Sequence, residues 1–242
     1  MVKRQTALKI RKTHRYLGIF IGIQFLMWTI SGLYFSWTDI DEIHGDQFRK
    51  EMVTFEKFQE LKSPSDVYSA AGITSVELKD IAGIPHYWLN DSKLVNAKTG
   101  EARSEISQEE AQMIAKQYMR EDLKVTGVER IDEAGDHHEY RGSPLPAYVI
   151  SYDSSENIRA YVAANNGAFR SVRYRDWRWF DFLWMTHTMD YEGRDDFNNL
   201  LLRAFSIMGL LTVLSGFTLW YTSSPTIRKI FNKNKNKKEK KK

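Results

Sequence analysis

The sequence contains no cysteine among its 242 residues. Disulfides, thiolate metal sites and iron–sulfur clusters are therefore excluded, and cysteine usage says nothing about the redox state of the compartment. The G-x-G-x-x-G motif of nicotinamide- and flavin-binding folds is also missing, as are the Ser/His/Asp and zinc-protease signatures. These absences argue against a hydrolase and against a flavin or nicotinamide site in this chain.

Charged residues are missing from residues 16–37, where Gln24 is the only strongly polar side chain. As a helix, this run is about 33 Å long, enough to cross a bilayer core of about 30 Å. A cleaved signal peptide is the alternative, but it would have an apolar run of about 7–15 residues and an A-x-A-like site after it. We therefore predict a retained transmembrane helix over residues 16–37.

A second apolar run covers residues 204–221, and the three leucines at 200–202 extend it. The mean hydropathy of −0.49 hides these two runs in an otherwise polar chain. Trp220 and Tyr221 form an aromatic end, and Pro225 stops the helix soon after. The sequence thus predicts a second transmembrane helix over residues 200–221.

The charges beside the two runs predict the orientation of the chain. Basic residues concentrate in residues 1–15 and 222–242, whereas acidic residues follow the first run. The positive-inside rule then places both termini in the cytoplasm and the domain between the two runs outside the membrane. The basic excess behind the net charge of +4 lies in these two tails, since the rest of the chain is acidic on balance; this suits anionic lipid rather than nucleic acid. We expect the tail over 222–242 to be disordered.

The chain between the predicted helices is internally duplicated. Residues 85–87 (PHY) and 146–148 (PAY) each open an apolar run, and residues 100–104 (GEARS) match residues 167–171 (GAFRS). Each copy is expected to be a helix packed on short antiparallel strands, an α+β architecture. Since so small a sheet needs a partner to bury its face, we expect the two copies to pack together.

The two units are assigned to residues 38–105 and 106–175. The first unit's helix is predicted over residues 65–71, and the second unit's helix begins at a capping box formed by Ser107 and Glu110. Strands are expected over residues 76–79, 87–89 and 93–96 in the first unit, and over residues 147–152, 158–163 and 168–174 in the second.

Residues 176–199 connect this domain to the second span. The aromatic density of residues 176–187 predicts a helix at the outer membrane surface. The polar residues 190–199 that follow cannot be buried in lipid. His187 is therefore expected at the outer interface rather than in the middle of the membrane.

Small residues accompany His14 on one face of the first span. Gly18 and Gly22 follow His14 at i+4 and i+8, so this face is either a close helix–helix contact or a flat surface for a planar ring beside an imidazole. The simpler interpretation of His14 is a cationic residue at the inner interface. Gly209 and Gly216 on the second span present the same choice between helix packing and room for a cofactor.

The remaining histidines are weaker candidates. His44 follows the first span and is expected on the surface. His86 lies in a predicted strand, where a histidine with satisfied hydrogen bonds is the ordinary case. His137 and His138 lie in the acidic loop over residues 132–142, which we expect to be solvated rather than to bind a metal.

Both spans resemble those of a known family. Residues 14–18 (HRYLG) look like the His-Arg-aromatic-Leu-Gly start of PepSY-associated transmembrane proteins, and residues 214–220 (LSGFTLW) are similar to their closing helix. The duplicated units resemble PepSY domains, including the second hairpin over residues 161–167. The resemblance covers nearly the whole chain apart from the tail. It implies two transmembrane helices flanking an extracytoplasmic domain of two PepSY-like units.

Some proteins of this family are inner-membrane ferric-siderophore reductases that hold b-type haem and pass electrons outward. The resemblance implies haem ligands at His14 and His187. Because each iron needs two imidazoles and these two lie about a bilayer apart, we expect a homodimer or a hetero-oligomer of the helices. Paired His14 residues would bind one haem, and paired His187 residues, or His187 with His44, a second. An electron-donor protein is a possible further partner.

Other PepSY domains are linked to protease regulation, so a second function stays open: a non-enzymatic, membrane-anchored binding or regulatory module. The chain also departs from the reductase pattern. It has two spans where larger relatives have more, no flavin domain, and a polar segment between His187 and the second span. Under the haem hypothesis, the chain is therefore either a ferric reductase or an electron-transfer subunit.

Overall fold

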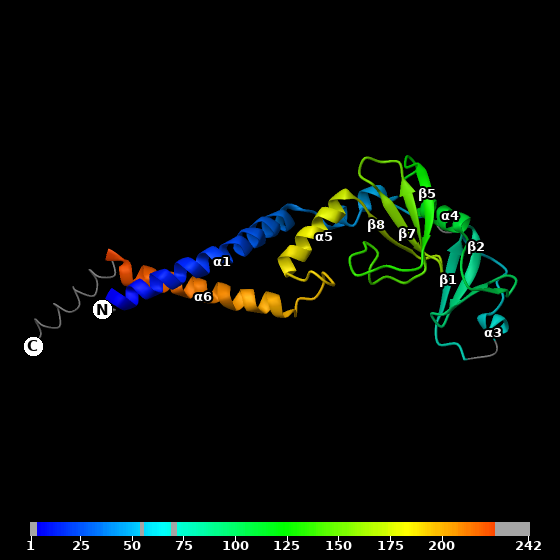
Figure 1. The fold of residues 1–242 in the computed structure, drawn as a ribbon. Coiled ribbons are helices and arrows are strands. Elements are labelled where there is room, and N and C mark those ends of the chain that lie inside the picture. The colour runs from blue at the N-terminus through cyan, green and yellow to red at the C-terminus, as the bar shows by residue number, and fades with distance from the viewer. Residues whose placement is uncertain (1–3, 54–55, 69–71, 226–242) are drawn as a thin grey trace, which may run out of the picture. The chain divides into compact units, whose positions relative to one another are not determined.

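The structure is a computed structural model that describes residues 4–53, 56–68 and 72–225. The chain divides into two compact units, one made of residues 1–36 and 183–242 and the other of residues 37–182. Figure 1 shows the helices of the first unit and the sheets of the second. We predict disorder for residues 222–242. Of these, residues 226–242 lie outside the described part of the chain.

Two long antiparallel helices, α1 (Arg4–Trp37) and α6 (Leu200–Ser223), form most of the first unit. Within them, Leu8–Trp37 and Leu200–Ser223 are long and apolar enough to cross a membrane. The apolar run over residues 16–37 lies inside α1, which begins earlier, in the basic lead-in. Large apolar side chains cover the outer surfaces of the pair, among them Ile19, Ile23 and Leu26 of α1 and Ile207, Leu210 and Leu214 of α6. Lipid is the environment that such a surface fits.

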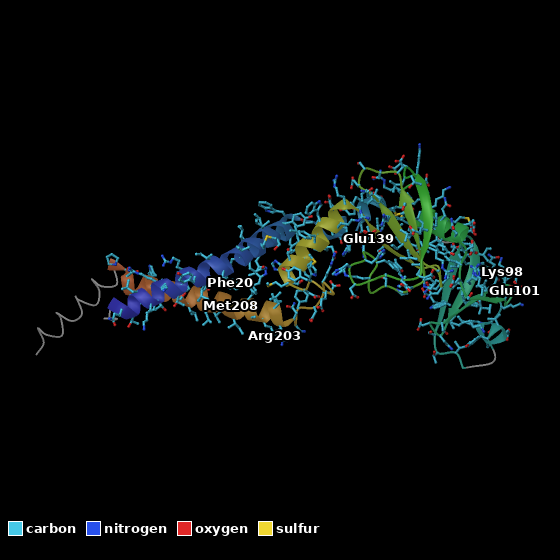
Figure 2. All side chains as sticks on the ribbon, in the orientation of Figure 1. Phe20, Lys98, Glu101, Glu139, Arg203 and Met208 are labelled. Carbon is cyan, nitrogen blue, oxygen red and sulfur yellow. The ribbon has the colours of Figure 1, made fainter. Side chains whose placement is uncertain are left out.

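Close contacts between α1 and α6 determine how the two helices pair (Figure 1). Ile21 is fully buried, and the rings of Phe20 and Phe205 stack with their centroids 5.6 Å apart. A Cβ atom on Gly209 would lie 3.3 Å from the Phe25 ring, so this glycine makes room for a side chain of α1. Figure 2 labels Phe20 and Met208 on the two helices. The small-residue face of α6 thus serves helix packing at Gly209.

The second unit contains two four-stranded antiparallel sheets, each in sequential order. The first consists of β1 (Val76–Ile81), β2 (Ile84–Leu89), β3 (Lys93–Asn96) and β4 (Ala102–Arg103). The second consists of β5 (Val125–Ile131), β6 (Ala147–Tyr152), β7 (Arg159–Ala163) and β8 (Phe169–Arg173). The predicted fold class, two apolar helices flanking a duplicated α+β domain, is confirmed.

Strand β5 was not predicted, and its β-bulge gives the reason. The register shifts between Val125 and Gly127, so Val125 and Val128 both pack on the main core although they are three residues apart, whereas Ile131 packs on the opposite face. A bulge inserts one extra residue and so breaks the two-residue alternation by which strands are recognised. The two-residue β4 was also missed.

Three short helices precede the first sheet in the second unit. Two short ones, α2 (Ile40–Ile43) and the 3-10 helix η1 (Asp46–Phe48), follow α1. Helix α3 (Pro64–Val67) is shorter than the helix predicted over residues 65–71. The prediction is wrong at Tyr68, which has left the helix, with φ −142° and ψ 68°. Residues 69–71 lie outside the described part of the chain.

The core of the second unit is shared by both sheets. Helix α4 (Gln108–Tyr118) starts at the predicted capping box and buries Ala111, Ile114 and Ala115. The same cluster takes Ile81, Trp88 and Leu94 from the first sheet and Ile150, Val162 and Val172 from the second. The two copies therefore bury one another's apolar faces, as the duplication predicted.

Helix α5 (Arg175–Thr188) corresponds to the aromatic segment predicted over residues 176–187. Its N-terminal part belongs to the second unit and its C-terminal part to the first. A short loop then leads to Asn199, whose side-chain oxygen accepts a hydrogen bond from the Leu202 amide and caps α6. The boundary between the two units thus falls within α5, between Phe182 and Leu183.

A buried carboxylate, Glu139 (labelled in Figure 2), links the loop after β5 to α5. Its side chain is 10% exposed. It accepts hydrogen bonds of 2.6 and 3.1 Å from Arg178 and one of 2.6 Å from the Tyr161 hydroxyl. Tyr140, fully buried, stacks on Tyr161 with centroids 4.7 Å apart. The prediction of a solvated loop is wrong for these residues, because the outer face of the second sheet is apolar and the loop covers it.

Replacing Glu139 with Gln tests this network. Burial by itself raises the pKa of Glu139, but the hydrogen bonds from Arg178 and Tyr161 and the nearby positive charges outweigh burial and hold the pKa below its usual value. The ionised group therefore stabilises the fold above the ordinary glutamate pKa of about 4.3, and this contribution is lost as the pH falls through the lowered pKa. We expect Glu139→Gln to lower the free energy of unfolding by about 2 kcal/mol at neutral pH.

The measurement is urea unfolding of the full chain in detergent, followed by near-UV circular dichroism at pH 7 and at pH 3. The difference between wild type and Glu139→Gln should shrink at pH 3. Glu105→Gln is the matched control, because Glu105 pairs with Arg130 while both side chains remain 30% or more exposed, so its loss should be less than about 1 kcal/mol. Equal losses in the two variants would contradict the prediction.

Candidate functional site

His14 lies on α1 and is held against α6. Its Nδ1 atom is 2.7 Å from the Ser215 hydroxyl. A Cβ atom on Gly216 would lie only 3.2 Å from Cε1 of the imidazole. Because Gly216 has no side chain, the ring of His14 can rest directly on the backbone of α6. The small-residue face of the second span therefore makes room for His14 at this position.

A groove with a volume of about 500 Å³ opens beside this imidazole. Such a volume falls within the range of about 300–1,000 Å³ that is usual for small-molecule and cofactor sites. The wall is mostly apolar and aromatic, and His14 is its titratable side chain. The lining residues are His14, Thr212, Val213, Gly216, Phe217 and Trp220.

His187 lies near the end of α5 and is held against α1. Its Nδ1 atom is 2.7 Å from the Ser31 hydroxyl, and its backbone carbonyl accepts a 2.8 Å hydrogen bond from the Trp28 indole. The Phe35 ring meets the imidazole edge-on, with centroids 5.6 Å apart. Burial lowers the pKa of His187 and so favours the neutral imidazole.

Gln24, the single strongly polar side chain of the first apolar run, also contacts α5. Its Nε2 atom donates a 3.2 Å hydrogen bond to the carbonyl of Thr186. Gln24, Trp28 and Ser31 follow one another at spacings of four and three, which places them on one face of α1. This face binds the last turns of α5 and so positions His187.

The two histidines share the same local arrangement. In each, Nδ1 contacts a serine hydroxyl of a neighbouring helix, while no described residue gives Nε2 a hydrogen-bond partner. His14 and Ser31 are separated along α1 by roughly 25 Å. The single chain therefore carries two separate imidazole sites, one near each end of α1.

Sequence analysis did not identify Ser31, Ser215 or Trp28 as parts of these sites. Ser31 could have been found, because a polar side chain in a lipid-spanning helix usually faces protein and Ser31 follows Gln24 by seven residues on the same face. Ser215 lies within the motif over residues 214–220. Its contact with His14 spans 201 residues, and local patterns carry no information on such a pairing.

Other predicted residues lie elsewhere. A Cβ atom on Gly18 or Gly22 would have no heavy atom within 4 Å, so neither glycine makes a close contact with α6. Whether they contact a second chain or a planar ring stays a prediction. His44 is exposed at the C-terminal cap of α2, in the second unit. His86 is buried, with Nδ1 3.0 Å from the Ile84 carbonyl, which confirms a histidine with a satisfied ring nitrogen.

The part of the chain that the structure describes has no group of three or more His, Asp or Glu residues that could hold a metal ion. A haem, whose porphyrin supplies the equatorial nitrogens, would need only axial ligands from the protein.

Comparison with known proteins identifies a family. A family model described as the PepSY-associated TM region matches residues 2–221. The match includes both histidine–serine pairs and the whole of the second unit. No curated protein and no solved structure matches the chain.

A valine at Gly216 should disturb the His14 site. Its Cβ atom would meet the imidazole at 3.2 Å, and the two further methyl groups would push the ring away from Ser215. We expect Gly216→Val to destabilise the helix pair by about 1–3 kcal/mol, as overpacking does. Unfolding by SDS, followed by tryptophan fluorescence, measures this loss. Gly18→Val is the matched control, because its Cβ would meet nothing within 4 Å; an equal loss in both variants would contradict the prediction.

Proposed function

The chain belongs to the PepSY-associated transmembrane family, and from this premise we propose that it binds b-type haem at His14 and at His187 and passes electrons across the bacterial inner membrane. The observation that carries the proposal is the hydrogen bonding of the two imidazoles. Each has Nδ1 held by a serine at 2.7 Å and Nε2 without a described partner. Metal-binding histidines have this arrangement, in which one ring nitrogen is held by the protein and the other binds the metal.

The surroundings of both histidines suit a haem. The groove beside His14 offers Phe217 and Trp220 as aromatic walls for a flat, apolar macrocycle. Phe35 meets the His187 imidazole edge-on, and Trp184 in turn packs against the Phe35 ring. A bound haem would supply a one-electron couple of its iron. The protein supplies the axial imidazole, its orientation and an apolar environment.

A second copy of the chain would complete each site. Bis-histidine ligation needs two imidazoles at each iron, and one chain presents a single histidine at each end of α1. A two-fold dimer would give a four-helix bundle in which each histidine meets its counterpart. The unfilled space at Gly18 and Gly22 supports a further helix or a macrocycle at this face. The proposed assembly is therefore a haem-binding homodimer.

The direction of electron flow follows from the proposed orientation. The basic lead-in of α1 and the basic tail are assigned to the cytoplasm, so His14 lies at the inner end and His187 at the outer end. Electrons would enter near His14 from a donor on the cytoplasmic side. They would leave near His187 toward an extracytoplasmic acceptor, of which ferric iron in a siderophore is the proposed example.

The absorbance spectrum tests the haem proposal. Full-length protein purified in detergent from haem-replete cells should show a Soret band and, after reduction with dithionite, sharp α and β bands. His14→Ala and His187→Ala should each lose absorbance, because each removes an axial ligand. His137→Ala, at an exposed position of the second unit, is the control and should keep the full spectrum. A colourless wild-type protein would exclude the proposal.

A colourless protein would leave the second candidate function, a non-enzymatic binding or regulatory module. The observation in its favour is that residues 37–182 form a compact unit around a core of their own. Such a domain could bind a partner without any electron transfer. Its partner should then be captured by the membrane protein irrespective of His14 and His187.

The proposed orientation can be tested by single-cysteine labelling, because the natural chain contains no cysteine. Lys98 is exposed in the second unit and is labelled in Figure 2; Lys12 is exposed near the start of α1. A membrane-impermeant maleimide added to intact spheroplasts should label Lys98→Cys and leave Lys12→Cys unlabelled until the cells are lysed. The opposite pattern would reverse the orientation and the direction of electron flow.

A further inference from the structure

The hydroxyl hydrogens of Ser31 and Ser215 have acceptors on their own helices. Ser215 Oγ lies 2.7 Å from the Thr212 carbonyl oxygen on α6. Ser31 Oγ lies 2.7 Å from the Met27 carbonyl oxygen and 3.2 Å from that of Trp28 on α1. Each serine therefore makes a short contact to a carbonyl and a second short contact to an imidazole.

A hydroxyl has one hydrogen and cannot donate to both neighbours. If the hydrogen of Ser215 pointed to His14, two oxygen lone pairs would face each other at 2.7 Å across the contact with Thr212, with no proton between them. The favourable arrangement has the serine donating to the carbonyl and accepting from the imidazole. Nδ1 of His14 then carries the hydrogen, so that in the neutral imidazole Nε2 keeps its lone pair. The same reasoning applies to Ser31 and His187.

This arrangement occurs twice, on different pairs of helices. A serine of α6 holds a histidine of α1, and a serine of α1 holds a histidine of α5. The two contacts connect residues that are 201 and 156 positions apart. Neither contact follows from the other, so each is separate evidence for the same role of the serine.

We infer that Ser215 and Ser31 are positioning residues that fix His14 and His187 as Nδ1–H tautomers and direct the Nε2 lone pair of each to a ligand. The assignment of the tautomers stands on the polypeptide alone. Its consequence for haem rests on the proposed function. A hydrogen bond from Nδ1–H to an acceptor increases the electron density at Nε2, which strengthens the bond to a metal and favours its oxidised state.

The tautomers can be measured without haem. Full-length protein labelled with ¹⁵N-histidine is reconstituted in nanodiscs without haem, and the ring nitrogens are observed by solid-state NMR, which separates protonated from bare nitrogens. His14→Gln and His187→Gln assign the signals. In wild type, both histidines should show a protonated Nδ1 and a bare Nε2. Ser215→Ala should abolish this preference at His14 alone, and Ser31→Ala at His187 alone.

Matched controls separate this role from a general effect on the helices. Ser36 of α1 and Ser223 of α6 also bond to a carbonyl of their own helix but contact no histidine. Ser36→Ala and Ser223→Ala should leave both tautomers unchanged. Ser31→Thr and Ser215→Thr retain the hydroxyl, so both histidines should keep the wild-type tautomers.

In haem-loaded protein, Ser31→Ala and Ser215→Ala should each raise the midpoint potential of one haem. They should also weaken haem binding by about 10-fold or more, as the loss of an outer-shell partner does. Redox titration followed by the α band measures both sites, and the alanine variants of Ser36 and Ser223 should match wild type.

The NMR experiment and the redox titration give distinguishable outcomes. Protonated Nε2 atoms in the wild-type protein, or tautomers that do not respond to the loss of the serine, would overturn the inference. The expected tautomers in a protein that binds no haem would support the serine role and exclude the proposed function. Haem that binds but keeps the same potentials in all variants would overturn the tuning of the metal by the serines.

Discussion

A polar side chain in a lipid-spanning helix needs a partner within the protein, because the hydrocarbon around it offers no hydrogen bonds. This constraint accounts for the contacts of α1. Gln24 donates to the Thr186 carbonyl, Trp28 donates to the His187 carbonyl, and Ser31 contacts the His187 ring. Since the apolar part of α1 over residues 16–37 has few other polar side chains, these contacts define where the end of α5 lies. The position of His187 is a consequence of satisfying polar groups on α1.

The same constraint operates at the other end of the pair. His14 finds Ser215 on α6, and Gly216 allows the imidazole to come close enough for the contact. His14 is therefore part of the packing between the two helices, and it borders a groove whose other walls are largely apolar. Helix packing and the wall of the groove use the same residues here.

In the second unit, the dominant constraint is the small size of each sheet. The first sheet ends in the two-residue β4, and the shared cluster around Ile114 and Ala115 gives both sheets one common core. The outer face of the second sheet is then covered by the loop containing Tyr140, and the Glu139 carboxylate binds Arg178 of α5. The helix that ends at His187 thus begins in a charge network of the domain. Its two ends are held by different kinds of interaction.

Hydropathy, charge and duplication in the sequence were enough to predict the two apolar helices, the duplicated α+β domain, the capping box at Ser107 and the aromatic helix before the second span. These features are local or repeat at short range, so they can be read from neighbouring residues. The bulged strand β5 and the burial of Glu139 escaped prediction, since one breaks the local period and the other depends on an apolar face formed by distant strands. The histidines could be named from the sequence. Only the tertiary structure decided that each has a serine partner, because such pairings join residues 201 and 156 positions apart and depend on which helix faces lie in contact.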